Sequence, residues 1–290
     1  MISKLIYINR RPVVGVWGGG NRFLTALIAA IVRAGHSVTH EPQRCDAAIA
    51  VGVERASFHE LSAEQTMQLA RDCSAVGIFR VNDCDARKNT DHVDASVRRA
   101  CALATQTVFV SKWLREYFRI DGTVIVNGVD KTVFKKSHHT ASTLPRVITH
   151  HWSDNRMKGA EWYEALDRAA AERLLLFTYV GRHKCNFTAT TVIPPCDGQE
   201  LARHLTNHDV YVSGSEHDPG PNHVLEAIAC EMPIIVRITG GGAVEFAGAR
   251  CATRTSEQML HKILTREYSL SETCVVSWEE CVSHFLELLQ

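Results

Sequence analysis

The sequence predicts an α/β protein made of two doubly wound halves, and three observations support this prediction. Short apolar runs alternate with amphipathic segments along most of the 290 residues, which is typical of parallel sheets covered by helices on both faces. The alternation stops once, in the polar segment 130–144, and then restarts. Glycine-rich turns follow predicted strands in both halves. A chain of this length has room for two such domains.

The first half begins with an apolar strand at 4–8 and a helix at 22–34. Apolar residues of that helix recur on one face, and Gly35 is well placed to end it. We predict the further strands of this half at 37–40, 47–51, 76–81, 108–110 and 124–126. We predict its further helices at 60–73, 91–104 and 112–118.

The second half follows an interdomain linker at about 130–144, which is rich in Ser, Thr and Lys and is followed by proline. Strands are predicted at 146–150, 174–180, 190–193, 210–213 and 234–237. Helices are predicted at 159–170, 197–204, 222–230 and 256–265. The last segment, 278–289, has apolar residues at helical spacing and is predicted to be an amphipathic helix.

Charge and composition exclude several classes of function. The 32 Lys and Arg residues balance the 32 Asp and Glu residues, so nothing favours bulk attraction to nucleic acid. No window is apolar enough for a membrane span, and the first residues do not form a signal peptide. We therefore expect a cytoplasmic protein without a transmembrane segment, while peripheral membrane contact stays open.

Cysteine and histidine are abundant, but their spacing indicates no metal centre. The ten cysteines form no CxxC pair, and the fifteen histidines form no HExxH pattern. Scattered cysteines in apolar surroundings are typical of reduced thiols in a core. We expect neither a disulfide framework nor a bound metal.

The first candidate binding motif is the turn before the helix at 22–34. Gly19, Gly20 and Asn21 stand there, and a glycine-rich helix start allows close approach of an anion. The pattern is not GxGxxG, which argues against a dinucleotide enzyme. A purely structural turn explains the same residues, so both interpretations stay open.

The second motif runs from the end of the strand at 146–150 to the helix at 159–170. Arg156 and Lys158 are placed to reach a diphosphate, and His151 can add a hydrogen-bond donor. An ordinary N-cap with solvated charges is the alternative.

The third motif runs from Asp218 through Gly220 to Glu226 and spans a loop and a helix start. We expect Asn222 to cap this helix and Glu226 to lie one turn inside it, on the side of His223. A carboxylate there can bind a ribose diol. A first-turn acid that interacts with the helix dipole is the alternative.

Two further patterns lie at strand ends. Gly240, Gly241 and Gly242 are expected to form a backbone nest for an anion, with a flexible loop as the alternative. Asp83 and Asp85 form a DxD triplet, a pattern of carboxylates that can hold a divalent metal. Since so short a pattern arises often by chance, we expect no metal there. Contact of Asp83 with a sugar or acceptor stays open.

Together these motifs resemble retaining glycosyltransferases of the GT-B fold, specifically glycosyltransferase family 4. The matching features are spread over most of the chain. They are the segment 33–38 (RAGHSV), 108–113 (VFVSKW), 124–130 (VIVNGVD), the pair Lys158-Gly159, the acid-x7-acid spacing of Asp218 and Glu226, and 241–245 (GGAVE).

The resemblance implies two Rossmann-like domains that face each other across a cleft. It implies an acceptor domain at 1–135, a nucleotide-sugar domain at 145–272, and a C-terminal helix, within 273–290, that returns to the first domain. The donor is a UDP- or GDP-type sugar, and no other cofactor and no metal is needed. The acceptor is a glycan, a lipid-linked molecule or a small molecule.

The resemblance also implies roles for single residues. Glu226 binds the ribose, Lys158 neutralises the diphosphate, and Asp218 contacts the donor sugar. Asp83 lies on the catalytic side of the first domain.

This sequence departs from the family pattern at several positions. Asp218 stands where the family usually has Glu, and Glu231 replaces a glycine. The family's arginine before the lysine is absent, and His151 and Trp152 occupy that region. Two alternatives to sugar transfer stay open: a non-catalytic nucleotide-sugar-binding subunit, and another GT-B reaction such as epimerisation of a nucleotide sugar.

Overall fold

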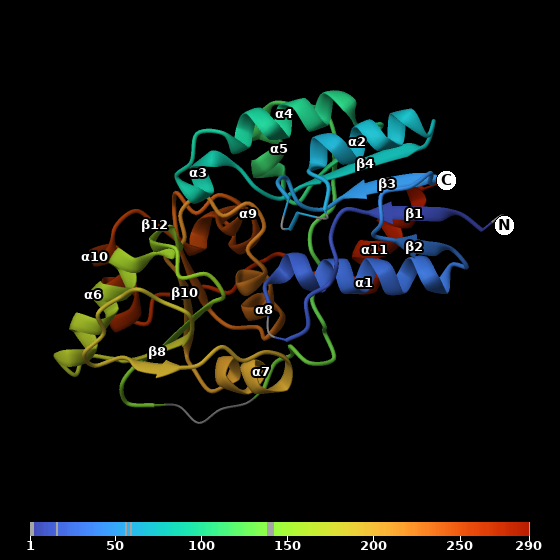
Figure 1. Ribbon diagram of the computed structural model, residues 1–290. Helices are drawn as coiled ribbons and strands as arrows, with labels where there is room; N and C mark the ends of the chain where they lie inside the picture. The colour runs from blue at the N-terminus through green and yellow to red at the C-terminus, as the bar shows by residue number, and fades with distance from the viewer. Residues whose placement is uncertain (1–2, 16, 56, 59, 138–141, 290) are drawn as a thin grey trace. The chain divides into compact units, whose positions relative to one another are not determined.

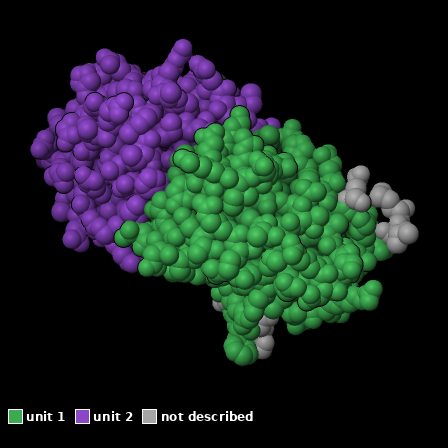
Figure 2. Space-filling model, turned by 90° about the horizontal axis from the view of Figure 1, so that it is seen from above, with its two compact units in different colours: residues 1–128, 276–290 green, residues 129–275 purple. Residues whose placement is uncertain are grey.

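The computed structural model describes residues 3–15, 17–55, 57–58, 60–137 and 142–289. The chain divides into two compact units, coloured separately in Figure 2. The first unit comprises residues 1–128 and 276–290, and the second comprises residues 129–275. Residues 138–141 of the expected linker lie outside the described residues.

The first unit contains a six-stranded parallel sheet in the order β2-β1-β3-β4-β5-β6. Its strands are β1 (Leu5–Ile8), β2 (Ser37–Thr39), β3 (Ala47–Ala50), β4 (Val76–Val81), β5 (Gln106–Phe109) and β6 (Thr123–Val124). Its helices are α1 (Gly19–Arg33), α2 (Ala63–Asp72), α3 (Asp85–Lys88), α4 (Val93–Leu103), α5 (Lys112–Phe118) and α11 (Trp278–Glu287).

Helices cover both faces of this sheet because its central strands are apolar on both sides. Alternate strand residues such as Ile6 and Ile8 pack against α1 and α11, whereas Phe79 and Val81 pack against α2, α4 and α5. Figure 1 shows α11, in red, beside α1. Phe285 of α11 and Phe23 of α1 have ring centroids 4.8 Å apart. The predicted return of the C-terminal helix to the first domain is thus confirmed.

The second unit contains another six-stranded parallel sheet, in the order β12-β11-β10-β7-β8-β9. Its strands are β7 (Arg146–His151), β8 (Leu176–Gly181), β9 (Thr191–Ile193), β10 (Val210–Ser213), β11 (Ile234–Arg237) and β12 (Ala252–Thr253). Its helices are η1 (Arg156–Lys158), α6 (Ala160–Ala171), α7 (Gly198–Thr206), α8 (Asn222–Ala229), α9 (Gly242–Ala247), η2 (Ala249–Cys251) and α10 (Ser256–Leu264).

One face of the second sheet packs against α6 and α10 through a core that includes Trp162, Leu166 and Ile263. Helices α7 and α8 lie on the other side of the sheet (Figure 1). The α/β architecture with two doubly wound sheets is therefore the one expected from the sequence. Among the helices of the described part of the chain, none has both the length and the apolar composition needed to span a membrane.

Several helix boundaries differ from the sequence predictions, and the short helices α3, η1, α9 and η2 were not predicted. Helix α1 begins at Gly19 rather than Arg22, since the Gly18 carbonyl already accepts a hydrogen bond from the Asn21 amide at 3.0 Å. The expectation that Asn222 caps α8 is wrong. Pro221 holds the N-cap position, and Asn222 is the first helical residue.

Candidate functional site

The predicted binding residues of the second unit converge at the carboxyl edge of its sheet. Strands β7, β10 and β11 are neighbours, and all three run in the same direction. The loops that follow them carry Lys158, Asp218 and the glycines 240–242. Ligands of open α/β sheets bind at this edge.

Lys158 ends the short helix η1, and the next residue, Gly159, packs against Gly214, just after strand β10. Gly159 has a φ of +107°, and a Cβ atom there would lie 2.5 Å from the carbonyl carbon of Gly214. Only glycine permits this conformation and this approach. Lys158 places its Nζ 2.5 Å from Oδ2 of Asp218. The two side chains are 16% and 5% exposed, so this ion pair is largely buried.

The glycine run 240–242 holds the backbone of Asp218. The Asp218 amide donates to the Gly240 carbonyl at 3.2 Å, and the Gly242 amide donates to the Asp218 carbonyl at 2.8 Å. A Cβ atom at Gly242 would lie 2.7 Å from the Pro219 oxygen. The Gly240 amide donates to the Arg237 carbonyl at 2.8 Å. The expected anion nest is therefore wrong for the amides of Gly240 and Gly242, because both already have acceptors in the protein.

Glu226 is buried and hydrogen-bonded to the end of strand β7. Its Oε2 lies 2.8 Å from Nε2 of His150, and only 3% of Glu226 is exposed. Residues 222–228 of α8 are all buried, and Glu226 lies among them. The carboxylate faces a polar partner and not an apolar core, and His150 holds it in a fixed orientation.

His223, one turn before Glu226, contacts both Asp218 and the buried Tyr211. Its Nε2 lies 3.3 Å from Oδ2 of Asp218, and its Nδ1 lies 3.0 Å from the Tyr211 hydroxyl. Burial lowers the pKa of His223 to about 4, although Asp218 opposes this shift. The imidazole is therefore neutral at pH 7, and it orients the Asp218 carboxylate without adding charge.

His151 is also buried, and its hydrogen bonds define its tautomer. The Tyr163 hydroxyl accepts hydrogen bonds from the Gly214 amide at 3.0 Å and from the Thr149 hydroxyl at 3.2 Å. It lies 2.5 Å from Nε2 of His151 and must donate its own proton there. His151 then carries its proton on Nδ1, which has no hydrogen-bond partner among the described residues.

His151 does not supply the charge of the arginine that the family pattern places in this region. Burial, followed by the neighbouring His223 and Lys158, holds the pKa of His151 well below its usual range. The side chain is therefore an uncharged donor at neutral pH. It remains a candidate for hydrogen bonding to a ligand, and Lys158 remains the buried cation of the group.

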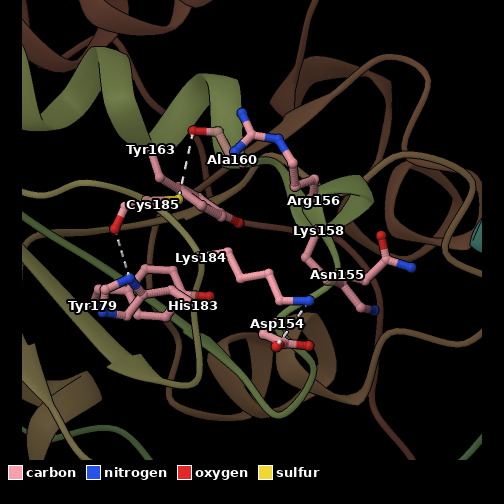
Figure 3. A pocket seen from close by; sticks show the side chains of 10 residues that line it. All are labelled: Asp154, Asn155, Arg156, Lys158, Ala160, Tyr163, Tyr179, His183, Lys184 and Cys185. Carbon is pink, nitrogen blue, oxygen red and sulfur yellow. Dashed lines mark hydrogen bonds and ion pairs between the residues drawn. The ribbon is translucent and has the colours of Figure 1, made fainter.

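Arg156 lies further out, beside a small pocket that Figure 3 shows from close by. Three cationic side chains, Arg156, Lys158 and Lys184, are among those that line it. Arg156 is 3.5 Å from a carboxylate oxygen of Glu164, and Lys184 is 3.2 Å from Asp154. These outer pairs are exposed and contribute little to stability, so they leave the cations available to an anion.

The remaining predicted residues of this region have supporting positions. Gly220 is half-buried in the loop that leads to Pro221, and Asn222 is buried in the first turn of α8. The sequence motifs did not indicate the roles of His150, Tyr163 and Tyr211. The two tyrosines could have been recognised, because a Tyr in a segment predicted to be buried needs a hydrogen-bond partner for its hydroxyl.

In the first unit, Gly20, Asn21 and Asp83 line one cavity of about 440 Å³. Gly19 precedes them in the first turn of α1. Both polar atoms of the Asn21 side-chain amide bond the Val13 backbone, at 2.8 and 2.9 Å, which indicates a structural role.

Asp83 and Asp85 do not point toward a common ligand. Asp83 pairs with Arg87 at 3.2 Å and with Lys88 at 2.5 Å. Asp85 accepts hydrogen bonds from the Thr90 hydroxyl and from the amides of residues 93 and 94. Burial alone raises the pKa of Asp85, but these hydrogen bonds outweigh it and lower the pKa. Asp85 of the triplet thus accepts hydrogen bonds from the first amides of α4 and stabilises the start of that helix.

Comparison with solved structures identifies the fold. Sucrose-phosphate synthase from Thermosynechococcus elongatus is similar with a TM-score of 0.68 at 13% identity, over 98% of this chain and 97% of that one. HepE from Anabaena, solved in complex with UDP-glucose, is similar with a TM-score of 0.65 at 13% identity, over 99% of this chain and 97% of that one. AviGT4, a glycosyltransferase involved in avilamycin A biosynthesis, is similar with a TM-score of 0.62 at 13% identity, over 99% of this chain and 97% of that one.

These neighbours are GT-B glycosyltransferases, and the chain has their fold along almost its whole length. No protein-family model and no curated protein matches the sequence. The likeness therefore establishes the fold, whereas the activity depends on the residues of the site.

Proposed function

We propose that this protein is a retaining glycosyltransferase that transfers a sugar from a UDP- or GDP-type nucleotide sugar without a metal. One observation carries the proposal. Lys158, Asp218 and Glu226 come from separate loops and helices and meet at the carboxyl edge of the second sheet. Lys158 is a cation that can contact a diphosphate, and Glu226 is an acid that can bind a ribose. Both groups are parts of a nucleotide sugar, and ligands of α/β proteins bind at this edge of the sheet.

The proposed roles follow from the contacts of each residue. Lys158 offsets the charge of the departing diphosphate, which is where negative charge develops in the transition state. Glu226, held by His150 at 2.8 Å, accepts hydrogen bonds from the ribose diol. Asp218 accepts hydrogen bonds from the donor sugar, and His151 adds an uncharged donor.

The structural neighbours support the donor class. The HepE structure contains UDP-glucose, and a starch synthase IV catalytic domain that is also similar contains ADP and acarbose. We propose that residues 145–272 bind the donor, that residues 1–135 bind the acceptor, and that 273–290 complete the acceptor domain. The acceptor is a glycan, a lipid-linked molecule or a small molecule, and the cavity beside Gly20 and Asp83 is its proposed site. The proposed location is the cytoplasm.

A thermal-shift screen against UDP, GDP and their sugars tests the donor class. A ligand that binds only the folded protein raises its melting temperature, so we expect a rise with one nucleoside diphosphate and a smaller effect with its nucleoside. Transfer is then tested by release of that diphosphate from the matching sugar. The anomeric configuration of the product, read by NMR, tests retention.

The Lys158–Asp218 pair favours one alternative, a non-catalytic nucleotide-sugar-binding subunit. The acid proposed for the donor sugar is already paired, at 2.5 Å, with the cation proposed for the diphosphate, and His151 adds no charge. Such a subunit binds the donor without releasing nucleoside diphosphate. Donor-dependent release therefore separates the two functions.

A further inference from the structure

Three side chains with metal-binding atoms gather where β9 leads into α7. Cys196 lies in the turn after β9, Glu200 in the first turn of α7, and His204 one turn further along. One ligand atom of each lies within 4.8 Å of the other two. Their spacing of four residues places Glu200 and His204 on one face of the helix.

The three side chains are not engaged in hydrogen bonds or ion pairs with other described residues, while Asp197 and Arg203 are close enough to act on them electrostatically. None of them forms a side-chain hydrogen bond or ion pair there, although the His204 backbone carbonyl is 2.7 Å from Nδ1 of His208. Asp167 of the same unit provides a contrast, because the amides and hydroxyls of Thr188 and Thr190 donate hydrogen bonds to its carboxylate oxygens. Cys196, Glu200 and His204 are thus available to an external ligand.

The donor set favours a borderline-soft cation over Mg²⁺ or Ca²⁺, which prefer oxygen ligands alone. A thiolate, an imidazole and a carboxylate are the ligands of Zn²⁺. With Zn–S of about 2.3 Å and Zn–N and Zn–O of about 2.0–2.2 Å, neighbouring ligands of a tetrahedral ion lie about 3.4–3.6 Å apart. Because the ligand atoms lie within 4.8 Å of one another, the side chains need to close by at most about 1.2–1.4 Å, which rotation of exposed Glu200 and half-buried His204 permits.

We propose that Cys196, Glu200 and His204 form a Zn²⁺ site with a water molecule as the fourth ligand. The ion fastens the turn 194–197, which joins the edge strand β9 to α7, onto the body of the helix. This site is separate from the residues at the ends of β7, β10 and β11. The ion is proposed to stabilise this turn and to take no part in sugar transfer. Its fourth position, held by water, sets it apart from structural zinc sites, which usually have four protein ligands.

Cobalt titration of the full chain tests the site directly, because Co²⁺ substitutes for Zn²⁺ and gives visible and near-ultraviolet bands. We expect one equivalent to bind with a thiolate-to-cobalt charge-transfer band, which Zn²⁺ then abolishes. Cys196→Ser should remove this band. His204→Gln should weaken Co²⁺ binding by at least about 10–100-fold, since even outer-shell partners of a metal contribute that much.

Cys274→Ser is the matched control, because Cys274 is an exposed cysteine of the same unit outside the three residues. Its cobalt spectrum should equal that of the wild type. Far-ultraviolet circular dichroism confirms that each variant is folded. Absence of a one-equivalent thiolate band in the wild type, or its persistence in folded Cys196→Ser, would overturn the proposal.

Discussion

Lys158 and Asp218 form an ion pair in which Nζ lies 2.5 Å from Oδ2, and both side chains are largely buried. The pair joins the end of η1 to the loop before α8. Any anion that contacts Lys158 must therefore compete with the Asp218 carboxylate. Since His223 also contacts Asp218 at 3.3 Å, this carboxylate keeps a partner when Lys158 turns to a ligand.

Replacement of Lys158 by Met should weaken binding of a nucleoside diphosphate much more than binding of its nucleoside. The substitution removes the buried cation of the group while it keeps most of the side-chain volume. Calorimetric titration of the two ligands gives the comparison. Lys158→Arg, which keeps the charge, should retain more of the affinity. Equal losses for both ligands would remove Lys158 from the phosphate site.

Asp218→Asn should release Lys158 from its ion pair with little change in size. We expect nucleoside diphosphate affinity to stay the same or to rise, while the rate of sugar transfer falls because a contact to the donor sugar is changed. Calorimetry and diphosphate release measure the two effects. A large loss of diphosphate affinity in the folded variant would show that Asp218 does not compete for Lys158.

Glu226→Gln should weaken nucleoside diphosphate binding by about 1–3 kcal/mol, the cost of leaving buried polar groups poorly paired. Calorimetry again provides the measurement. Glu231→Gln is the control, because Glu231 is exposed just after the same helix and pairs with Lys136 at 2.8 Å. Equal affinity in wild type and folded Glu226→Gln would reject the ribose role.

Acid should destabilise the protein between about pH 6.5 and pH 4. Burial lowers the pKa of His208 and of His223 from 6.5 to about 4. In that window the unfolded chain binds more protons, so the contribution of these two histidines to the free energy of unfolding falls as pH decreases and is fully present above pH 6.5. Each histidine contributes up to about 3 kcal/mol.

Urea unfolding as a function of pH measures this slope. His208→Gln changes none of the residues proposed to bind the nucleotide and keeps a polar side chain near Thr178. It should reduce proton uptake on unfolding by up to about one. An unchanged slope in this variant would contradict the assignment of His208.

Sugar transfer should survive treatment with a chelator, because Asp83 and Asp85 are engaged with neighbouring groups in the first unit. Rates measured before and after EDTA test this expectation. Loss of activity that Mg²⁺ or Mn²⁺ restores would revive a metal at the triplet. Recovery with Zn²⁺ alone would contradict both this expectation and the separation of the Cys196 site from sugar transfer.

Much of the fold could be predicted because buried parallel strands are short and apolar. The runs at Val76–Val81 and Ile234–Arg237 show this, and their strands appear where they were expected. Helix starts were harder to predict, since a backbone turn such as the one at Gly18 leaves no side-chain signal. The short helices α3 and α9 contain too few residues to show a period.

The candidate site was predicted in its parts but not in its connections. Local spacing placed Lys158, Asp218 and Glu226 at strand ends and helix starts. It could not reveal that Glu226 is paired with His150, 76 positions earlier in the chain. Nor could it show that the amides of Gly240 and Gly242 are used by neighbouring carbonyls. Such pairings depend on sheet order, which places β7 beside β10.

The central claim is that a nucleoside diphosphate binds at Lys158 and Glu226. Titration calorimetry of UDP and GDP into wild type, Lys158→Met and Glu226→Gln tests it most directly. We predict one binding site for one of these nucleotides in the wild type and a clear loss of affinity in each folded variant. Failure of both nucleotides to bind the folded wild type, or equal affinity in all three proteins, would contradict the claim.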